Sequence, residues 1–346
     1  MYMKKKIAIF TALLTVVISA MAQSVEVSRD NEIFAIKGKD TLKIDAYYAP
    51  KLQVKPEGRP VMVYIHGGGF VGGERKNVAQ EIFCRYLAER GWLAVSVDYR
   101  LAGIRQNADG SVLNPYKVDG TVSAVRIACE DVVAATNYIL AHKVWKANPK
   151  QVTLGGGSAG AITTLQLIYD AANDVSYTRK LPKGFTYAGG ISQAGCICTP
   201  VSEDTLTWKR KPCPIMFFHG EKDIIVPLDA EKASWGDCKL FGTHYVARQL
   251  KAMEVPYWKW IEHGADHVMA MKPLTNYLEE QLRFLNDFCL KGLQSTVSTE
   301  VEDQKPSSMA SIEEMLKYVP MYILGYGKYM EEMDWEHLNK PTEIKY

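Results

Sequence analysis

A serine held between two glycines is the first pattern in this chain that indicates a chemical reaction. Ser158 lies in Gly156-x-Ser158-x-Gly160, after an apolar, β-branched run at 151–154 and before a helix-like run at 161–172. A serine hydroxyl is a weak nucleophile, and a tight strand-to-helix turn can push it towards a base. Glycine fits the crowded positions on either side, and the helix N-terminus favours developing negative charge. The motif alone is only moderately specific, because similar turns also bind phosphate or simply reverse the chain.

A second glycine-rich turn could supply hydrogen-bond donors for a reacting oxygen. His66-Gly67-Gly68-Gly69 follows a continuous apolar run at 60–66, which predicts a buried strand that ends in a glycine loop. Without side chains, backbone N–H groups can approach a substrate oxygen closely. We predict that the amides of Gly68, Gly69 and Ala159 form an oxyanion hole.

A serine nucleophile also needs a base and an acid that orients the base, and both follow it in the chain. Asp223 comes in the first turn after an apolar strand at 214–220, and Glu221 is the alternative acid. The last predicted strand leads into a loop with His263 and His267, of which His267 lies deeper in the loop and is the preferred base. These two histidines could also ligate a metal ion, but no third ligand is evident, so we expect neither metal nor cofactor.

Five motifs in this order resemble a known family. They are HGGGF (66–70), VDYRLA (97–102), GGSAG (156–160), HGEKDIIVP (219–227) and GADHV (264–268). The chain resembles α/β-hydrolases of the hormone-sensitive-lipase-like and feruloyl or acetylxylan esterase group from roughly residue 39 to residue 290. The resemblance implies a triad of Ser158, Asp223 and His267. It also implies that Asp98-Tyr99-Arg100 ties the oxyanion loop to the core, with Asp131 paired to Arg100.

The order of predicted elements supports the same fold class. Apolar strands alternate with helical patterns, which predicts an α/β protein with a mostly parallel, twisted sheet and helices on both faces. The predicted function is that of an exported serine carboxylesterase that forms an acyl-enzyme. Its expected substrates are small-molecule or carbohydrate esters with short acyl or feruloyl groups, with plant polysaccharide as one candidate source. Phe70, Tyr116 and Trp208 are candidate aromatic contacts, although packing or rim roles compete for each of them.

Two other functions remain open at this stage. A serine peptidase or amidase could use the same groups, because acyl transfer to water does not distinguish an ester from an amide. A non-catalytic protein could also retain the fold for binding. The intact order of nucleophile, acid and base argues against this second alternative.

The chain divides into three parts. Residues 1–22 have three lysines, an apolar run and small residues, which predicts a signal peptide and a secreted or periplasmic protein. The apolar run is too short for stable membrane insertion. Residues 23–293 form the expected catalytic domain, and residues 294–346 form a linker and a helical C-terminal appendage.

The charge balance and the cysteines exclude further classes. Loss of residues 1–22 takes the 41 Lys and Arg to 38, against 39 Asp and Glu, so the net charge becomes −1. This balance gives no reason to expect nucleic acid or an anionic membrane as a partner, and a homo-oligomer remains open. The seven cysteines lack the spacing of a zinc site, and most stand in apolar contexts typical of core residues.

Overall fold

The structure, a computed structural model, describes residues 25–103, 105–106, 112–113, 120–233 and 238–302. Three features predicted from the sequence lie outside these residues: the signal peptide, Tyr116 and the part of the C-terminal appendage beyond residue 302. The remaining predicted site residues can all be placed.

One nine-stranded sheet forms the centre of the molecule, in the order β1-β2-β4-β3-β7-β8-β10-β13-β14. The pairings β1–β2 and β2–β4 are antiparallel, and every other neighbouring pair in this sheet is parallel. The strands are β1 (Ser28–Lys37), β2 (Asp40–Tyr48), β3 (Arg59–Ile65), β4 (Leu93–Val97), β7 (Ala147–Gly157), β8 (Gly189–Gln193), β10 (Ile215–Gly220), β13 (Tyr257–His263) and β14 (Thr296–Glu302).

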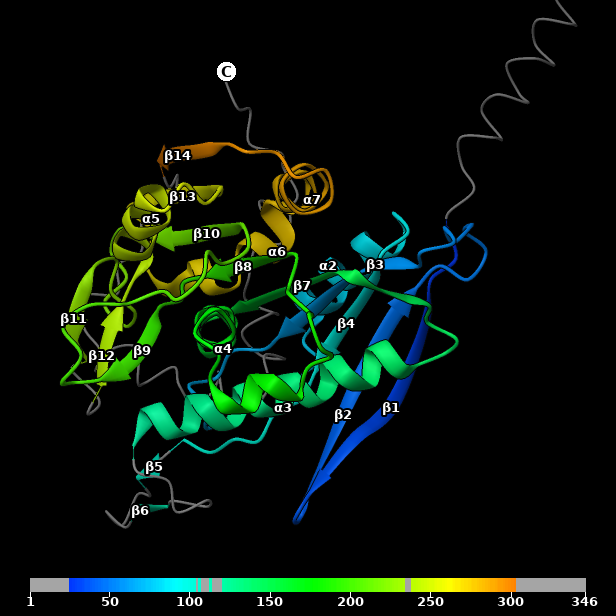
Figure 1. The fold of residues 1–346 in the computed structure, drawn as a ribbon, viewed down its shortest axis with the longest axis horizontal. Coiled ribbons are helices and arrows are strands. Elements are labelled where there is room, and N and C mark those ends of the chain that lie inside the picture. Colours follow the sequence, from blue (N-terminus) through cyan, green and yellow to red (C-terminus); the bar gives the residue numbers. More distant parts are fainter. Residues whose placement is uncertain (1–24, 104, 107–111, 114–119, 234–237, 303–346) are drawn as a thin grey trace, which may run out of the picture.

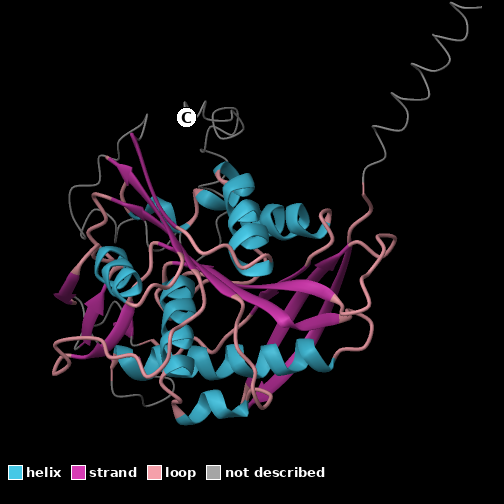
Figure 2. Ribbon diagram, turned by 45° about the horizontal axis from the view of Figure 1, so that its top comes forward, coloured by secondary structure: helices cyan, strands magenta, loops and turns pink. Residues whose placement is uncertain are grey.

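Helices cover both faces of this sheet, as Figures 1 and 2 show. One face packs against α3 (Thr121–Ala141), α4 (Ala159–Ala172) and α5 (Thr243–Ala252). The opposite face packs against α2 (Val78–Ala88), α6 (Pro273–Asn276), α7 (Leu278–Phe284) and the π-helical turn η3 (Leu285–Leu290). The predicted mostly parallel sheet with helices on both faces is therefore confirmed.

Burial explains why the central strands are apolar throughout. All five residues of β4 and all six of β10 are buried, as expected for parallel strands covered on both sides. At the edge, β1 and β14 alternate between half-buried and exposed residues, a pattern typical of a strand with one solvated face.

Short elements complete the fold. A three-stranded sheet has the order β11-β12-β9 and a two-stranded sheet pairs β5 with β6. Their bounds are β5 (Arg105–Gln106), β6 (Val112–Leu113), β9 (Ile197–Pro200), β11 (Ala230–Lys232) and β12 (Cys238–Phe241), and the 3-10 turns are η1 (Ser176–Lys180) and η2 (His267–Ala270).

The predicted linker is in part a strand. Residues 296–302 form β14, which pairs in parallel with β13 along its whole length, from Tyr257 opposite Thr296 to His263 opposite Glu302. The Ser, Thr, Glu, Asp, Lys and Pro residues of this run predicted a linker. The segment nevertheless completes the sheet, because an edge strand needs only one buried face, and Trp258 of β13 donates a hydrogen bond to Thr299 at 2.9 Å.

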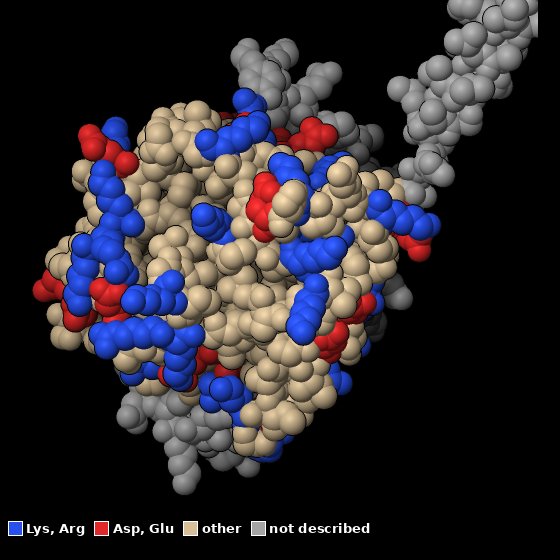
Figure 3. Space-filling view, turned by 45° about the vertical axis from the view of Figure 1, so that its right-hand side comes forward, with Lys and Arg blue, Asp and Glu red and all other residues tan. Residues whose placement is uncertain are grey.

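The parallel strands bring the functional loops to one edge. β3, β7, β10 and β13 point the same way, so the segments that follow their last residues emerge at the same edge of the sheet. Within the described residues, no helix has the length and apolar content that a membrane crossing requires. On the face shown in Figure 3, charged side chains lie among uncharged residues, with Asp and Glu beside several of the Lys and Arg.

Candidate active site

The turn between β7 and α4 holds Ser158 in a strained conformation. Its φ of 52° and ψ of −121° lie in a region that non-glycine residues rarely adopt. A Cβ at Gly156 would lie 2.5 Å from the backbone of Gly160, and a Cβ at Gly160 would lie 2.0 Å from the Ile65 carbonyl oxygen. Close backbone contacts therefore require both motif glycines, Gly156 against Gly160 and Gly160 against the end of β3. Ser158 stands directly before the first residue of α4.

The structure brings Ser158, His267 and Asp223 into one hydrogen-bonded chain. Nε2 of His267 lies 2.8 Å from Oγ of Ser158, and Nδ1 of His267 lies 2.7 Å from Oδ2 of Asp223. His263, the alternative base, instead lies 3.3 Å from Glu221, the alternative acid. The geometry therefore places His267 next to Ser158 and Asp223 next to His267, and it pairs the two alternatives with each other at the surface.

Asp223 is held on both of its oxygens. Its side chain is fully buried, and Oδ1 accepts hydrogen bonds from the amides of Ile225 at 2.9 Å and Val226 at 3.0 Å. Oδ2 faces His267 and also lies 3.4 Å from Nε2 of His219. Two amides and His219 thus hold the carboxylate in contact with His267.

His219 is a residue of this site that sequence reasoning missed. It is fully buried at the end of β10, with Nδ1 2.8 Å from the Thr243 hydroxyl and Nε2 2.9 Å from the Val226 carbonyl. A carbonyl can only accept, so Nε2 carries a hydrogen that also points towards Asp223. The available signal was its position four residues before Asp223 in the motif at 219–227.

His267 and Asp223 shift each other's pKa, and the two shifts have opposite directions. Burial alone would lower the pKa of His267, but the charge and hydrogen bond of Asp223 outweigh burial and raise it above its ordinary value. Burial alone would raise the pKa of Asp223, but His267 and His219 hold it well below its ordinary value. Asp223 is therefore ionised at neutral pH and stabilises the protonated imidazole.

The glycine loop after β3 passes over the serine. Gly68 has a φ of 122° and Gly69 a φ of 61°, and a Cβ on Gly67 would lie 3.3 Å from Cβ of Ser158. The amide of Ala159 is at the start of a helix, where N–H groups have no intrahelical partner. Among the described residues, no acceptor takes the amide hydrogens of Gly68, Gly69 or Ala159. These three amides remain the predicted oxyanion donors.

Tyr99 and Arg100 secure this loop to the core, as the family resemblance implied. The Tyr99 ring stacks on His66 at 4.4 Å, and its hydroxyl donates to the His66 carbonyl at 3.0 Å. Arg100 donates from Nε to Oδ2 of Asp131 at 2.8 Å and from Nη2 to Oδ1 at 2.8 Å. This bidentate pair anchors the segment after β4 to α3.

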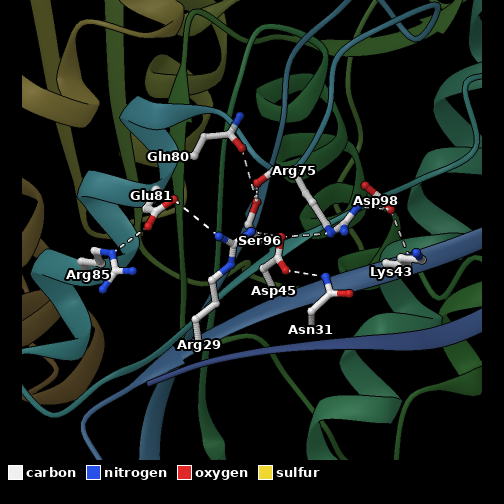
Figure 4. Close-up of polar contacts among 10 residues, drawn as sticks. All are labelled: Arg29, Asn31, Lys43, Asp45, Arg75, Gln80, Glu81, Arg85, Ser96 and Asp98. Atoms are coloured by element: carbon white, nitrogen blue, oxygen red, sulfur yellow. Dashed lines mark hydrogen bonds and ion pairs between the residues drawn. The ribbon is translucent and has the colours of Figure 1, made fainter. Parts of the chain in front are cut away.

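A buried ion cluster fixes the far end of the same loop (Figure 4). Arg75, which follows the glycines, lies 3.0 Å from Asp45 through Nε and donates to Asp98 at 2.8 Å through Nη1. Asp45 is fully buried on β2 and also accepts from Asn31 at 2.6 Å and from Arg29 at 3.2 Å. The glycine loop is thus tied at both ends to the rigid sheet.

The structure changes the interpretation of the predicted aromatic contacts. Phe70 is only 3% exposed and packs edge-on against Tyr99, so its side chain belongs to the core. Trp208 packs edge-on against Tyr169, eleven residues along α4 from Ser158, which corresponds to about 16 Å of helix. Trp208 therefore lies at the end of α4 away from the nucleophile. Tyr116 is outside the described residues.

Solved structures share this arrangement of sheet and helices. The chain is similar to an inhibited esterase B from Lactobacillus rhamnosis, with a TM-score of 0.50, 16% identity and coverage of 83% of this chain and 96% of that chain. The α/β-hydrolase fold is thereby established. It is also similar to a fungal esterase from Rhizomucor miehei, with a TM-score of 0.50, 16% identity and coverage of 80% of this chain and 88% of that one.

Sequence comparisons find similarity to esterases in the N-terminal half of this α/β-hydrolase. Residues 18–182 match the profile of the carboxylesterase family. The chain is similar to esterase B1 of Culex pipiens, at 30% identity over 158 residues, which is 43% of this chain and 26% of that protein. Gut esterase 1 of Caenorhabditis elegans is 28% identical over 145 residues, which is 42% of this chain and 24% of that protein. The match thus spans about a quarter of the length of these two relatives.

Proposed function

We propose that this α/β-hydrolase is a serine ester hydrolase that works through an acyl-enzyme. The observation that carries the proposal is the position of His267, whose imidazole bridges the Ser158 hydroxyl and the buried Asp223 carboxylate. The carboxylesterase profile over residues 18–182 and the similarity to named esterases support an ester as substrate.

In the proposed first half-reaction, Nε2 of His267 accepts the Ser158 proton as Oγ attacks the ester carbonyl. Asp223 stabilises the imidazolium that results. Negative charge moves to the carbonyl oxygen, where the amides of Gly68, Gly69 and Ala159 can donate hydrogen bonds. His267 then returns the proton to the leaving alcohol, and the acyl group remains on Ser158.

In the second half-reaction, His267 removes a proton from water, and the hydroxide attacks the acyl-enzyme. The same amides stabilise the second tetrahedral intermediate, and collapse returns the proton to Ser158 and releases the acid. The side chains and amides that the scheme uses all belong to this chain, and the only other reactants are the ester and water.

The proposed substrate class and location rest on the sequence. The resemblance to feruloyl and acetylxylan esterases favours short acyl or feruloyl esters, and the predicted signal peptide favours secretion or a periplasmic location. A panel of p-nitrophenyl esters from acetate to octanoate, together with methyl ferulate and acetylated xylan, tests the substrate class. The intact mass of the exported protein tests whether it begins at Gln23.

The decisive test of the chemistry compares Ser158→Ala with Ser192→Ala. Ser192 is also fully buried, in the neighbouring strand β8, and it takes no part in the proposed chain. We expect Ser158→Ala to lose at least about 10³-fold in kcat on p-nitrophenyl acetate, while Ser192→Ala stays within a few fold of the wild type. Undiminished hydrolysis by Ser158→Ala would refute the proposal. Cleavage of dipeptide amides in preference to esters would favour a peptidase.

A further inference from the structure

Behind the candidate active site, three buried polar side chains from distant parts of the chain join end to end. We propose that Tyr64, Gln193 and Gln281 are positioning residues, which together set the distances between the oxyanion loop, the nucleophile turn and the histidine loop. The inference rests on the proposed function, because it assigns these residues a role in that reaction. None of the three belongs to the motifs identified in the sequence.

The hydrogen bonds of this chain run in one direction. The Tyr64 hydroxyl donates to Oε1 of Gln193 at 2.8 Å, and Nε2 of Gln193 donates to Oε1 of Gln281 at 2.9 Å. Nε2 of Gln281 then donates to the carbonyls of Pro273 at 2.7 Å and Tyr277 at 3.1 Å. Tyr64 is 1% exposed and both glutamines are fully buried, so water cannot replace a lost partner.

Each of the three hydrogen-bonded side chains is connected to a different segment of the candidate active site. Tyr64 stands on β3, two residues before His66 and the glycine loop. The carbonyl of Gln193 accepts the amide hydrogen of Ser158 at 2.9 Å. The hydrogen bond between Tyr64 and Gln193 therefore joins β3, which precedes the glycine loop, to the residue that holds Ser158.

Gln281 completes the connection on the side of the base. Its two carbonyl acceptors belong to Pro273 and Tyr277, the first residue of α6 and the residue that follows α6. Only η2 and a short connection separate α6 from His267, the first residue of η2. A displacement of Gln281 would therefore move the segment that carries the base relative to Ser158.

Polar side chains at these three buried positions indicate that the segments they join must be held at fixed distances. Apolar side chains of similar volume would fill the space between sheet and helix without the cost of burying amides. A one-way chain of hydrogen bonds, in contrast, is satisfied in one arrangement only, because any shift leaves a buried donor or acceptor without its partner. Catalytic groups need this kind of restriction, since an error of about 1 Å in their placement can cost 100-fold in rate.

The test uses Tyr64→Phe, Gln281→Met and the double variant. We expect each single change to lower kcat on p-nitrophenyl acetate by about 10- to 100-fold, with KM within threefold of the wild type. If the residues act as one unit, the two losses in kcat are not independent. The loss in the double variant should therefore be at least about tenfold smaller than the product of the two single losses. Labelling of Ser158 by a fluorophosphonate should slow in parallel.

Tyr187→Phe and Gln166→Met are the matched controls. The Tyr187 hydroxyl is buried against Thr136 at 3.1 Å, and Gln166 is buried on α4 against Asp170 at 3.0 Å, so each loses a similar hydrogen bond. The controls should retain kcat within twofold even where their melting temperatures fall. If the test variants also keep kcat within twofold after a similar drop in melting temperature, the chain is merely structural and the inference is refuted.

Hydrogen–deuterium exchange separates this inference from the proposed function. Tyr64→Phe and Gln281→Met should speed exchange in peptides that cover 155–160 and 267–272, while the controls should not. If the wild type neither hydrolyses esters nor reacts with the fluorophosphonate, the proposed function fails. The exchange data then decide the positioning role by themselves, and unchanged exchange in both peptides overturns it.

Discussion

Gly157, the residue immediately before the nucleophile, should not tolerate alanine, although the motif places no restriction on this position. A Cβ at Gly157 would lie 2.0 Å from the carbonyl oxygen of Ala270. Close carbon–oxygen contacts in proteins are about 3.3 Å, so the two backbones would have to separate by more than about 1 Å. Neither partner is a flexible side chain that could rotate away.

This separation would disrupt the site directly. Ala270 is the last residue of η2, which begins at His267, so the clash pushes the base away from the nucleophile that follows Gly157. A displacement of about 1 Å can lower a rate by about 100-fold, which corresponds to about 2.7 kcal/mol of activation free energy. We therefore expect Gly157→Ala to lose about 100-fold in kcat with a smaller change in KM.

Gly155→Ala is the matched control for this experiment. Gly155 is two residues earlier on β7, and the nearest atom to its added Cβ is Sδ of Met62 at 3.0 Å, the far part of a flexible side chain. Both variants would be assayed on p-nitrophenyl acetate and melted in the same buffer, and Gly155→Ala should stay within a few fold in kcat. If Gly157→Ala retains kcat within twofold of the wild type, the contact between η2 and the nucleophile turn does not govern catalysis.

Three further changes test other parts of the site. Because Asp223 raises the pKa of His267, and only neutral imidazole can accept the serine proton, kcat/KM should rise with pH through a midpoint above about 6.5; a midpoint at or below that value contradicts the charge argument. Arg75→Met removes one partner from the fully buried Asp45 and should lower the free energy of unfolding by about 3 kcal/mol in urea titrations, whereas a loss near zero would show that the cluster does not anchor the loop. Trp208→Ala should leave kcat on p-nitrophenyl acetate within twofold, and a tenfold loss would restore Trp208 as a substrate contact.

The contact of Ser158, Asp223 and His267 could be predicted from the sequence because each of the three follows a recognisable strand. The glycines around Ser158 indicate a crowded turn, and the apolar run before Asp223 indicates a strand that ends there. In a parallel sheet, strand ends meet at one edge regardless of their separation in the chain. Sequence order and local pattern were therefore sufficient to predict which of these residues come together.

The supporting contacts could not be predicted in the same way. Tyr64 and Gln193 are 129 residues apart, and their hydrogen bond depends on how two strands and a helix pack. Arg75 follows β3 and Asp45 lies on β2, and these two strands are separated in the sheet by β4, so their contact likewise depends on the assembled sheet. A glutamine or arginine in a sequence carries no sign of the partner that it will meet, because such a side chain is usually exposed to solvent.

The burial of Phe70 and the strand within the predicted linker could not be predicted for a related reason. Phe70 follows the glycine loop in the sequence, yet it has a φ of 63° and turns into the core beside Tyr99. Position next to a functional loop does not decide which side of the loop a side chain takes. The segment at 296–302 looked like a linker because composition alone cannot reveal that β13 leaves an open edge for another strand.

The strain at the nucleophile is shared with the neighbouring strand end. Ser158 after β7 and Ala194 after β8 both have positive φ values, 52° and 56°, and such conformations cost about 1–3 kcal/mol each in non-glycine residues. The Ser158 amide donates to the Gln193 carbonyl at 2.9 Å, and the Ala194 amide donates to the Phe218 carbonyl of β10 at 2.7 Å. Each strained residue is thus held by the next strand, and β10 carries the loop of Asp223. Backbone hydrogen bonds to neighbouring strands therefore hold the turn of Ser158 against β8 and the end of β8 against β10, the strand that leads to Asp223.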